Sequence, residues 1–571
     1  MESTFKKPSL IQALTPIVVL ILLLMISVMS IWGGDSLDGA NQMALLFATT
    51  VAALIGWRLK YKWKDMLSGI SDSILSALPA LLILLLIGAL AGTWLISGIV
   101  PSMIYYGLKI LNPTIFLFAA CLVSAIISLA TGSSWTTIAT IGVALLGIGQ
   151  AMDIHSGLIA GAIISGAYFG DKMSPMSDTT NLAPAVSGTD LFTHIRYMMW
   201  TTIPSIVITL IIFFIIGFFV GDGGNTDEID GILSAIEGSF YVTPWLFLVP
   251  AAVVFMIIKK VPAIPALFAG ALLGGVAALV FQPEIIKEKG VKNTISIEGE
   301  EAHLYTFDWF QNDEKIKGND KLTNQDGGDY KLVISKDGNV EATGIFTLPE
   351  ALDTAAMSNF SLAFDDNSIN KLGLTATLSR SNYLEASYRS IINAMTVDTS
   401  VKTSSAKVNK LLSTGGMSGM LNTIWLILCA MSFGGILDKL GMLSKITEVI
   451  VSKAQSRGSL IATTTLTCIG FNVTASDQYL AIVVPGKMFS KTYRDRGLAP
   501  QNLSRTLEDS GTVTSVLVPW NTCGAAQSHV LGIATGEYFL FCFFNIISPI
   551  MTIIYGYFGI KIAKLKEKND D

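Results

Sequence analysis

The chain contains little charge for its length. Only 14% of its 571 residues are Asp, Glu, Lys or Arg, whereas a soluble domain usually carries about 25%. Hydrophobic residues make up 51%, and the mean hydropathy is +0.57. This composition excludes an ordinary soluble protein and predicts an all-α polytopic membrane protein. The formal net charge of −5 argues against nucleic acid as a partner.

Motifs for disulfides, metal clusters and catalysis are also missing. The cysteines lie in apolar stretches without CxxC or Cys/His spacing, so we expect small buried side chains. His155, His194 and His529 are isolated, and they either pack or relay protons. No nucleophile–base pair is present, so we predict neither an enzyme nor a cofactor. The five cysteines are Cys121, Cys429, Cys468, Cys523 and Cys542.

Long apolar runs predict about ten to twelve membrane spans, two or more of them interrupted. The first run follows Lys6 and Lys7 and is too long for a signal peptide. A short interfacial helix is expected at 99–111 and an acidic loop at 222–242. The expected spans are 10–32, 41–57, 74–96, 113–149 with a break at 131–137, 199–220, two that end at 259 and 281, 417–437, 460–474, 479–489 and 529–562.

The distribution of basic residues predicts an orientation. The positive-inside rule places every basic cluster in the cytoplasm. The clusters lie at 58–64, 439–457, 487–505 and the C-terminus. Both termini are then cytoplasmic. The acidic 222–242 segment lies outside, as does the polar insert that interrupts the membrane region. We expect the bacterial cytoplasmic (inner) membrane.

The polar insert, 285–386, separates an N-terminal membrane half (1–284) from a C-terminal half (387–571). Within it, residues 330–346 alternate apolar and polar side chains around Asp337-Gly338-Asn339, which predicts a β-hairpin. We expect a small β-rich extracytoplasmic domain. It serves either as an accessory domain or in ligand delivery or sensing, and no partner is predicted for it.

The two membrane halves show a weak repeat. Gly98 and Gly441 are 343 residues apart, as are Thr131 and Thr474. Chance remains an alternative in so apolar a chain. The charge distribution gives the first repeat (74–221) and the second (417–560) opposite orientations. Inverted-topology repeats with broken or re-entrant helices are typical of secondary transporters, and the breaks indicate the binding site.

Four polar interruptions, 131–137, 165–181, 472–478 and 507–522, supply the oxygen ligands that a small hard cation requires. A carboxylate in such a site also binds protons, so that a proton and a cation compete for one group. We therefore predict Na⁺ and H⁺ as ligands of the same residues. The predicted ion- and proton-binding residues are Asp171, Asp477, Asp509, Asp178, Thr131, Ser133, Ser134, Ser174, Thr179, Asn181, Asn472, Thr474, Ser476, Ser510 and Asn521.

Structural roles remain open for several of these residues. Asp171 could form an ion pair with the adjacent Lys172, and Asp178 could cap the helix that follows it. Glu508 and Asp509 follow a basic residue and could lie at the cytoplasmic interface. The small residues of TGSSW could serve only tight helix packing.

These segments resemble the NhaC-type sodium/proton antiporter family, within the wider ion-transporter superfamily. The resemblance implies alternating-access exchange of Na⁺ for H⁺, and it leaves a homodimer open. Some relatives exchange small carboxylates or amino acids with coupled cations, so that substrate remains a second hypothesis; a signalling receptor is a third. The insert at 285–386 is a departure from a compact member. The segments are SLATGSSWTT (128–137), GAYFGDKMSPMSDTTNLA (166–183), FGGILDKLGML (433–443), FNVTASDQYLAIVVPGKMF (471–489) and SRTLEDSGTVTSVLVPWNTCGA (504–525).

Overall fold

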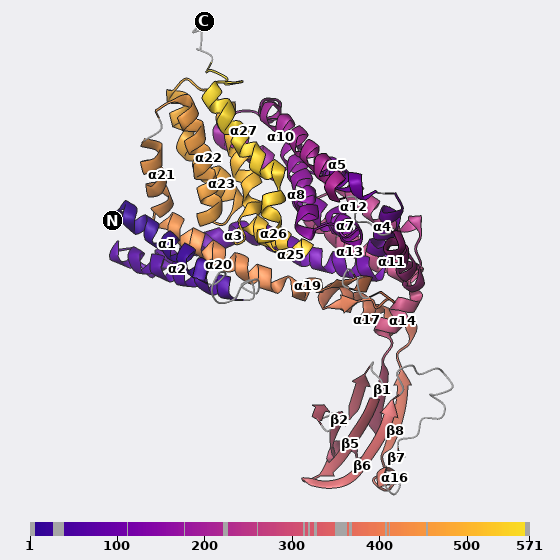
Figure 1. Ribbon diagram of the computed structural model, residues 1–571. Helices are drawn as coiled ribbons and strands as arrows, with labels where there is room; N and C mark the ends of the chain where they lie inside the picture. The colour runs from indigo at the N-terminus through magenta and orange to yellow at the C-terminus, as the bar shows by residue number, and fades with distance from the viewer. Residues whose placement is uncertain are drawn as a thin grey trace. The chain divides into compact units, whose positions relative to one another are not determined.

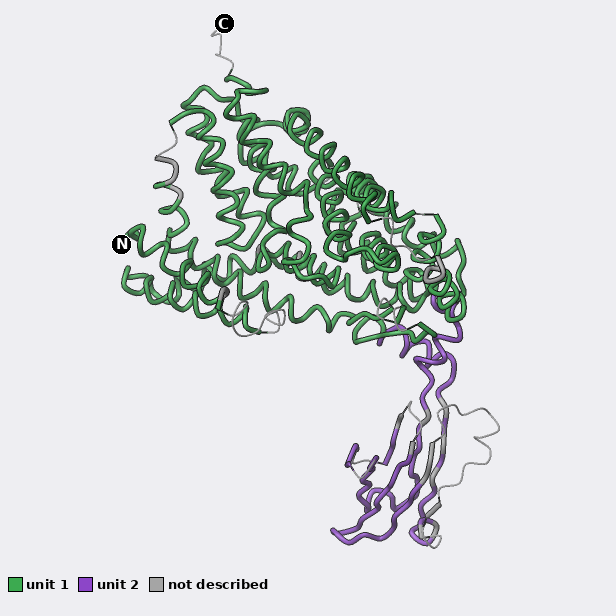
Figure 2. Tube along the Cα trace, in the orientation of Figure 1, with its two compact units in different colours: residues 1–277, 394–571 green, residues 278–393 purple. Residues whose placement is uncertain are grey.

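The computed structural model divides into two compact units (Figure 2), one formed by residues 1–277 and 394–571 and the other by residues 278–393. The larger unit is helical and the smaller one is largely β-sheet. The structure describes residues 6–26, 39–110, 112–175, 177–220, 226–259, 261–311, 314–317, 320–324, 328–348, 363–364, 368–405, 408–409, 412–452 and 455–565.

The first part of the helical unit runs from α1 to α13 (Figure 1). A π-helical segment, Ile138–Gly142, joins α6 to α7, so that Ser134–Ala151 forms one continuous span. The helices are α1 (Leu10–Ile26), α2 (Ala40–Arg58), α3 (Trp63–Ile96), α4 (Ile99–Ile110), α5 (Pro113–Thr131), α6 (Ser134–Thr137), α7 (Val143–Ala151), α8 (Ser156–Met173), α9 (Asp178–Ser187), α10 (Leu191–Val220), α11 (Thr226–Ser239), α12 (Leu248–Ile258) and α13 (Ala263–Phe281).

The second part of this unit runs from the end of α17 to α27. A two-stranded ribbon of β9 (Thr399–Ser400) and β10 (Ser413–Thr414) precedes its long helices. A second π-helical segment, Glu508–Thr512, follows α24. The helices are α17 (Tyr383–Thr396), α19 (Gly416–Gly419), α20 (Leu421–Lys439), α21 (Met442–Ser452), α22 (Arg457–Thr474), α23 (Gln478–Asp495), α24 (Pro500–Leu507), α25 (Thr522–Leu531), α26 (Thr535–Tyr538) and α27 (Phe543–Phe558).

Among the described residues, seven helices are long and apolar enough to cross a membrane, or up to nine if two bent pairs each count as one span. This is fewer than the ten to twelve expected from the sequence. The difference has a physical cause, because α8, α22 and α23 are each 18 residues long but carry polar side chains and are absent from the seven. The first expected span is described only as far as Ile26.

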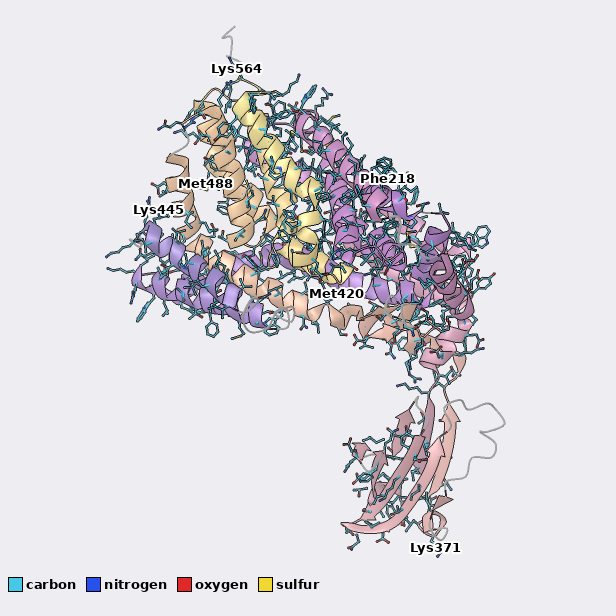
Figure 3. The ribbon with its side chains drawn as sticks, in the orientation of Figure 1. Phe218, Lys371, Met420, Lys445, Met488 and Lys564 are labelled. Atoms are coloured by element: carbon cyan, nitrogen blue, oxygen red, sulfur yellow. The ribbon has the colours of Figure 1, made fainter. Side chains whose placement is uncertain are left out.

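The surface of α10 shows why the helical unit requires an apolar environment. Only 28% of its most apolar window is buried within the protein. Ile211, Ile215 and Phe218 are more than half exposed, and Phe218 lies on the outer side of the helix (Figure 3). An exposed apolar surface of this kind would be a liability in water. In a multi-pass membrane protein it faces lipid.

Close helix packing fixes the parts of this unit that carry the polar breaks. α3 packs along α20, and α22 packs against α23 and α27 (Figure 1). α8 lies against α5 through glycines. A Cβ atom at Gly170 would fall 2.3 Å from the carbonyl oxygen of Ala125, so only glycine allows this approach. Because Gly170 precedes Asp171, this contact also fixes where Asp171 lies.

Helix ends recur at a nearly constant spacing in the two parts. Gly98 and Gly441, both left-handed, follow α3 and α20 and lie 343 residues apart. Gly188 and Gly532, also left-handed, cap α9 and α25 and lie 344 residues apart. The same order of a long helix, a short helix and two broken helices thus occurs twice.

Of two short segments outside the long spans, one differs from its expected structure. Residues 222–242 do not form a loop throughout, because α11 occupies Thr226–Ser239 and buries Ile232, Ala235 and Ile236 at helical spacing. The helix expected at 99–111 is present as α4, which packs against α7, and its place at a membrane interface stays a prediction. In both segments, apolar side chains at helical spacing are buried by packing.

The smaller unit contains two antiparallel sheets, one of order β3-β2-β5-β6-β7 and one of order β4-β1-β8. The predicted hairpin is confirmed: β5 and β6 pair through Asp337 and Gly338, both with positive φ. Trp309 and Leu332 lie in its buried core. The elements are α14 (Pro283–Gly290), β1 (Asn293–Glu298), β2 (Thr306–Gln311), β3 (Glu314–Lys317), β4 (Lys321–Asn324), β5 (Gly328–Lys336), β6 (Asn339–Leu348), β7 (Ala363–Phe364), α16 (Ser368–Lys371) and β8 (Thr375–Arg380).

Candidate functional site

The first break, between α5 and α6, depends on a left-handed glycine and a serine cap. α5 ends at Thr131, and Gly132 (φ 68°) turns the chain. The Ser133 side chain then accepts the N–H of Thr136 at 3.2 Å and begins the next helix. The corresponding break in the second part has the same design. Ser476 (φ 58°) turns the chain after α22, and Asp477 caps α23.

The other break of the first part lies between α8 and α9 and is closed by side chains. Ser177 caps α9, which begins at Asp178, so Asp178 is not the cap. The Thr180 hydroxyl donates to the carbonyl oxygen of Lys172 at 3.0 Å. The Asn181 amide donates to the carbonyl oxygen of Ser177 at 2.7 Å. These bonds satisfy backbone groups that the break would otherwise leave unpaired inside the protein.

Two asparagines secure the breaks of the second part. Asn472 donates to the carbonyl oxygen of Gly511 at 2.7 Å, and Asn521 donates to the carbonyl oxygen of Asn472 at 3.0 Å. Asn521 also caps α25. Thr474 donates to a carbonyl one turn earlier in its own helix, and Ser510 does the same. Asn472 and Asn521 therefore hold the breaks together, whereas Thr474 and Ser510 bond locally.

A cavity of about 550 Å³ brings the two parts together. Carboxylates and hydroxyls enter it from the first part, and Asp477 enters it from the second. α3 and α13 complete the wall with apolar residues. The predicted site residues that line it are Thr131, Ser133, Asp171, Asp178, Thr179, Asn181 and Asp477, and lining residues outside that prediction include Pro79, Trp135, Ser177, Pro262, Gln478, Tyr479, Thr522 and Cys523.

Asp171 is one of three carboxylates that line this cavity, together with Asp178 and Asp477. It lies near the C-terminal end of α8 with 7% of its surface exposed. The Ser134 hydroxyl donates to its Oδ2 at 2.7 Å. The lining residues that the structure describes include no Lys or Arg, so no basic side chain within the cavity compensates this carboxylate. It can therefore bind a cation or a proton.

Asp509 lies elsewhere, among fully buried partners. Its carboxylate forms an ion pair with Lys172 and accepts hydrogen bonds from Thr201 at 2.7 Å and from Thr552. The Lys172 ammonium also donates a hydrogen bond to the Ser548 hydroxyl at 2.9 Å. Lys172 thus pairs with Asp509 of the other part of the chain rather than with Asp171. Neither residue lines the cavity.

Glu508 differs from both aspartates. It is fully buried at the start of the π-helical segment. The Thr179 hydroxyl donates to its Oε1 at 3.0 Å, whereas its Oε2 has no hydrogen-bond partner. The sequence did carry a signal for this residue, because Ser504, Glu508 and Thr512 recur every four positions and share one helical face.

The remaining predicted residues occupy the edges of the site. Ser134 binds Asp171 from outside the cavity lining. Ser174 is buried at the end of α8, and Ser476 is buried with a hydroxyl that has no hydrogen-bond partner. The part of the chain that the structure describes contains no group of three or more His, Cys, Asp or Glu that could hold a metal ion. A cation in this cavity would depend on one or two carboxylates together with hydroxyl and carbonyl oxygens.

A second cavity, of about 720 Å³, is lined by two of the helices that also line the first cavity. Thr140 and Gln150 line it from the span Ser134–Ala151, whose start faces the first cavity. His529 lines it from α25, whose first residues face the first cavity. The second cavity therefore lies at the other end of α25, and along the span it begins at Ala139, about one turn after Thr136 of the first cavity.

Comparison with known proteins places the chain among transporters. It matches the model of the Na⁺/H⁺ antiporter family over residues 166–289 and 368–560. It is 33% identical to the Na⁺/H⁺ antiporter NhaC of Alkalihalophilus pseudofirmus, over 91% of this chain and 90% of that protein. It is 31% identical to the malate-2H⁺/Na⁺-lactate antiporter of Bacillus subtilis, over 92% of this chain and 90% of that protein.

Two further similarities extend this comparison. The arginine/ornithine antiporter ArcD of Halobacterium salinarum is 32% identical, over 98% of this chain and 93% of that protein. The solved structure of Neisseria gonorrhoeae MtrF aligns with 96% of this chain and 95% of that one, at 11% identity and a TM-score of 0.32. That structural score is too low to carry an argument.

Proposed function

Because the chain belongs to the Na⁺/H⁺ antiporter family, we propose that it exchanges Na⁺ for H⁺ across the cytoplasmic membrane by alternating access. The observation that carries the proposal is the Asp171 carboxylate. It lies in a cavity built from helix breaks of both parts of the chain, and no described Lys or Arg lines that cavity.

Asp171 is proposed as the shared binding group. With Na⁺ bound, its carboxylate supplies charge while hydroxyl and backbone oxygens of the breaks replace the water of the ion. With a proton bound, the same group is neutral. The site changes the side to which it opens readily when Na⁺ or a proton is bound, and slowly when it is empty and charged. This difference couples the movement of the two ions. The Ser134 hydroxyl holds the carboxylate in position for both states.

Alternating access is proposed to use the repeated architecture. The recurrence of helix ends at spacings of 343 and 344 residues supports the predicted repeats. Opposite orientation of the two repeats would give the cavity equivalent access from both sides. The second cavity, which follows the first along the span Ser134–Ala151 and lies at the other end of α25, supports a second access route.

A second candidate function is the exchange of a small organic solute with a coupled cation. The volume of about 550 Å³ favours it, because that space is typical of sites for small organic molecules. The acidic lining favours an amine or amino acid over a simple carboxylate. Lys172, the basic residue adjacent to Asp171, is already paired with Asp509.

The two candidates are separated by a screen of the purified protein in liposomes loaded with a pH-sensitive dye. Na⁺ alone should change the internal pH if the chain is a Na⁺/H⁺ antiporter. If the pH responds only when an amino acid or a carboxylate is also supplied, the second candidate holds. If no combination gives a response in correctly inserted protein, both proposals fail.

A further inference from the structure

We propose that Glu508 is a second proton-binding carboxyl group of the exchange cycle, joined to the cavity that holds Asp171 by the hydroxyls of Ser177 and Thr179. This inference rests on the proposed exchange of a cation for protons. It adds a second group to the Asp171 site and a route that connects the two.

The geometry supplies a continuous line of hydroxyls. Ser177 and Thr179 both line the cavity, and their hydroxyl oxygens are 3.2 Å apart. The Thr179 hydroxyl donates to Oε1 of Glu508 at 3.0 Å. At the other end, Ser177 and Asp171 line the same cavity. Glu508, from the second part of the chain, thereby has a route of two hydroxyls into the cavity that holds Asp171.

The comparison with Asp509 shows why Glu508 is the residue that would carry a proton. Asp509 receives an ammonium group and hydroxyls, which compensate its charge. Glu508, equally buried, receives one hydroxyl at Oε1 and no partner at Oε2. An ionised carboxylate with so few partners is unfavourable to bury. A protonated carboxyl group avoids that cost.

Other charged groups near Glu508 do not remove this difference. Lys172 and Asp171, both on α8, act on it electrostatically. The ammonium of Lys172 is bound to Asp509, and the carboxylate of Asp171 repels a second negative charge. Arg505 on the preceding turn donates to the carbonyl oxygen of Lys561 at 3.2 Å. Other elements packed against this segment also carry titratable groups. His194 of α10 is bonded to Ser504, and Tyr493 of α23 is bonded to Thr464. Cys468 of α22 lies near Ser510.

The proton transfer balances without another reactant. A hydronium ion in the cavity donates a proton to the oxygen of Thr179 while Thr179 donates its own proton to Oε1 of Glu508, which leaves a water molecule and a neutral carboxyl group. Release runs along the same hydroxyl in the opposite direction. Repulsion between Asp171 and Glu508 then links the two groups. Bound protons keep Asp171 and Glu508 from both being negatively charged. A Na⁺ ion beside Asp171 supplies positive charge in their place, so the protons can leave.

The coupling ratio tests this inference directly. Wild-type protein and Glu508→Gln are placed in liposomes, and the opposing Na⁺ and pH gradients at which net flux vanishes give the protons exchanged per cation. We expect Glu508→Gln to lose one proton per cycle and to have an altered pH profile, while it still responds to Na⁺. Glu448→Gln, on the exposed surface of α21, is the matched control.

A second variant tests the route and does not alter the carboxyl group. Thr179→Val keeps the side-chain volume but removes the hydroxyl, and we expect proton-coupled flux to fall about tenfold or more. Thr209→Val is its control, since that hydroxyl is bonded only within α10. A wild-type coupling ratio and pH profile in Glu508→Gln would overturn the inference. If Glu508→Gln does not assemble, wild-type flux in Thr179→Val would overturn it.

Failure of the inference and failure of the proposed function give different results. If Glu508 plays no part, wild-type protein and Glu508→Gln exchange Na⁺ for H⁺ with the same ratio. If the proposed function is wrong, the wild-type protein itself shows no proton flux driven by Na⁺. The second result overturns both.

Discussion

Asp171 and Asp509 are both buried acidic residues in helix breaks, but their surroundings differ. Asp171 faces a cavity and accepts a hydrogen bond from Ser134 at 2.7 Å. Asp509 is fully buried and is bound by an ammonium and two hydroxyls. The first can exchange its partner for an ion, whereas the second is already compensated. Of the adjacent residues Asp171 and Lys172, the aspartate therefore faces the cavity. The lysine forms a buried ion pair with Asp509.

This difference separates ion binding from assembly. Lys172 of α8 and Asp509 of the second π-helical segment join the two parts of the chain, 337 residues apart in sequence. Breaking a buried pair leaves an uncompensated charge and is strongly destabilising. Removing the Asp171 charge instead leaves no charged group without its partner, because Asp171 is bonded to the Ser134 hydroxyl. Substitutions at the two sites should therefore fail in different ways.

The largest effect on transport is expected from Asp171→Asn. The asparagine keeps the shape of the side chain but cannot bind and release a proton, so Na⁺-dependent proton flux should fall to background. Flux is measured in everted vesicles with a pH-sensitive dye, and the amount of inserted protein is checked in parallel. Asp72→Asn, on an exposed part of α3, serves as control. Full activity in Asp171→Asn would remove this residue from the mechanism.

The next effect, on stability, is expected from Lys172→Met. It leaves the Asp509 carboxylate buried with hydroxyls alone, which should cost about 3–5 kcal/mol. The purified variant should unfold at a clearly lower temperature in detergent, and the double variant Lys172→Met, Asp509→Leu should recover part of the loss. Lys439→Met is the control, because that lysine is exposed. A melting temperature equal to that of the control would show that the pair contributes little.

A smaller effect is expected from Ser134→Ala. The variant loses the hydrogen bond to Asp171, and a bond to a charged group contributes about 1.5–3 kcal/mol. The Na⁺ concentration for half-maximal exchange should rise about tenfold, which corresponds to about 1.4 kcal/mol. Ser187→Ala, whose hydroxyl bonds within α9, should change it little. An unchanged Na⁺ dependence in Ser134→Ala would argue that Asp171 needs no such support.

The smallest effect is expected from deletion of residues 285–386. The family model matches the chain on both sides of residues 290–367. The smaller unit, residues 278–393, which contains the deleted segment, has its own core of buried residues. Transport by the shortened chain should remain measurable in liposomes. Loss of transport despite normal membrane insertion would show that the insert takes part in the mechanism.

Local signals in the sequence indicated the helix break after Thr131 and the β-hairpin. Gly132 and Ser133 have the sequence of a helix end followed by a cap, and the structure places that break where it was expected. The Asp337-Gly338 turn gave the hairpin in the same way. These features depend on a few neighbouring residues, so the sequence carries them directly.

Features that depend on distant contacts could not be predicted. Nothing near Lys172 in the sequence shows that its partner is Asp509 rather than Asp171. Pro79 and Pro262 line the cavity although neither supplies an ion ligand. Asp509 and Glu508 are adjacent and equally polar, but their partners come from different helices. Packing between the two parts of the chain decides these roles.

The pH response to Na⁺ alone tests the central claim most directly. Wild-type protein and Asp171→Asn are compared in the same liposomes with an acidic interior and no organic solute. Addition of external Na⁺ should raise the internal pH with the wild-type protein and leave it unchanged with Asp171→Asn. An internal pH that stays constant with the wild-type protein, or that rises equally with both proteins, would contradict Na⁺/H⁺ exchange at Asp171.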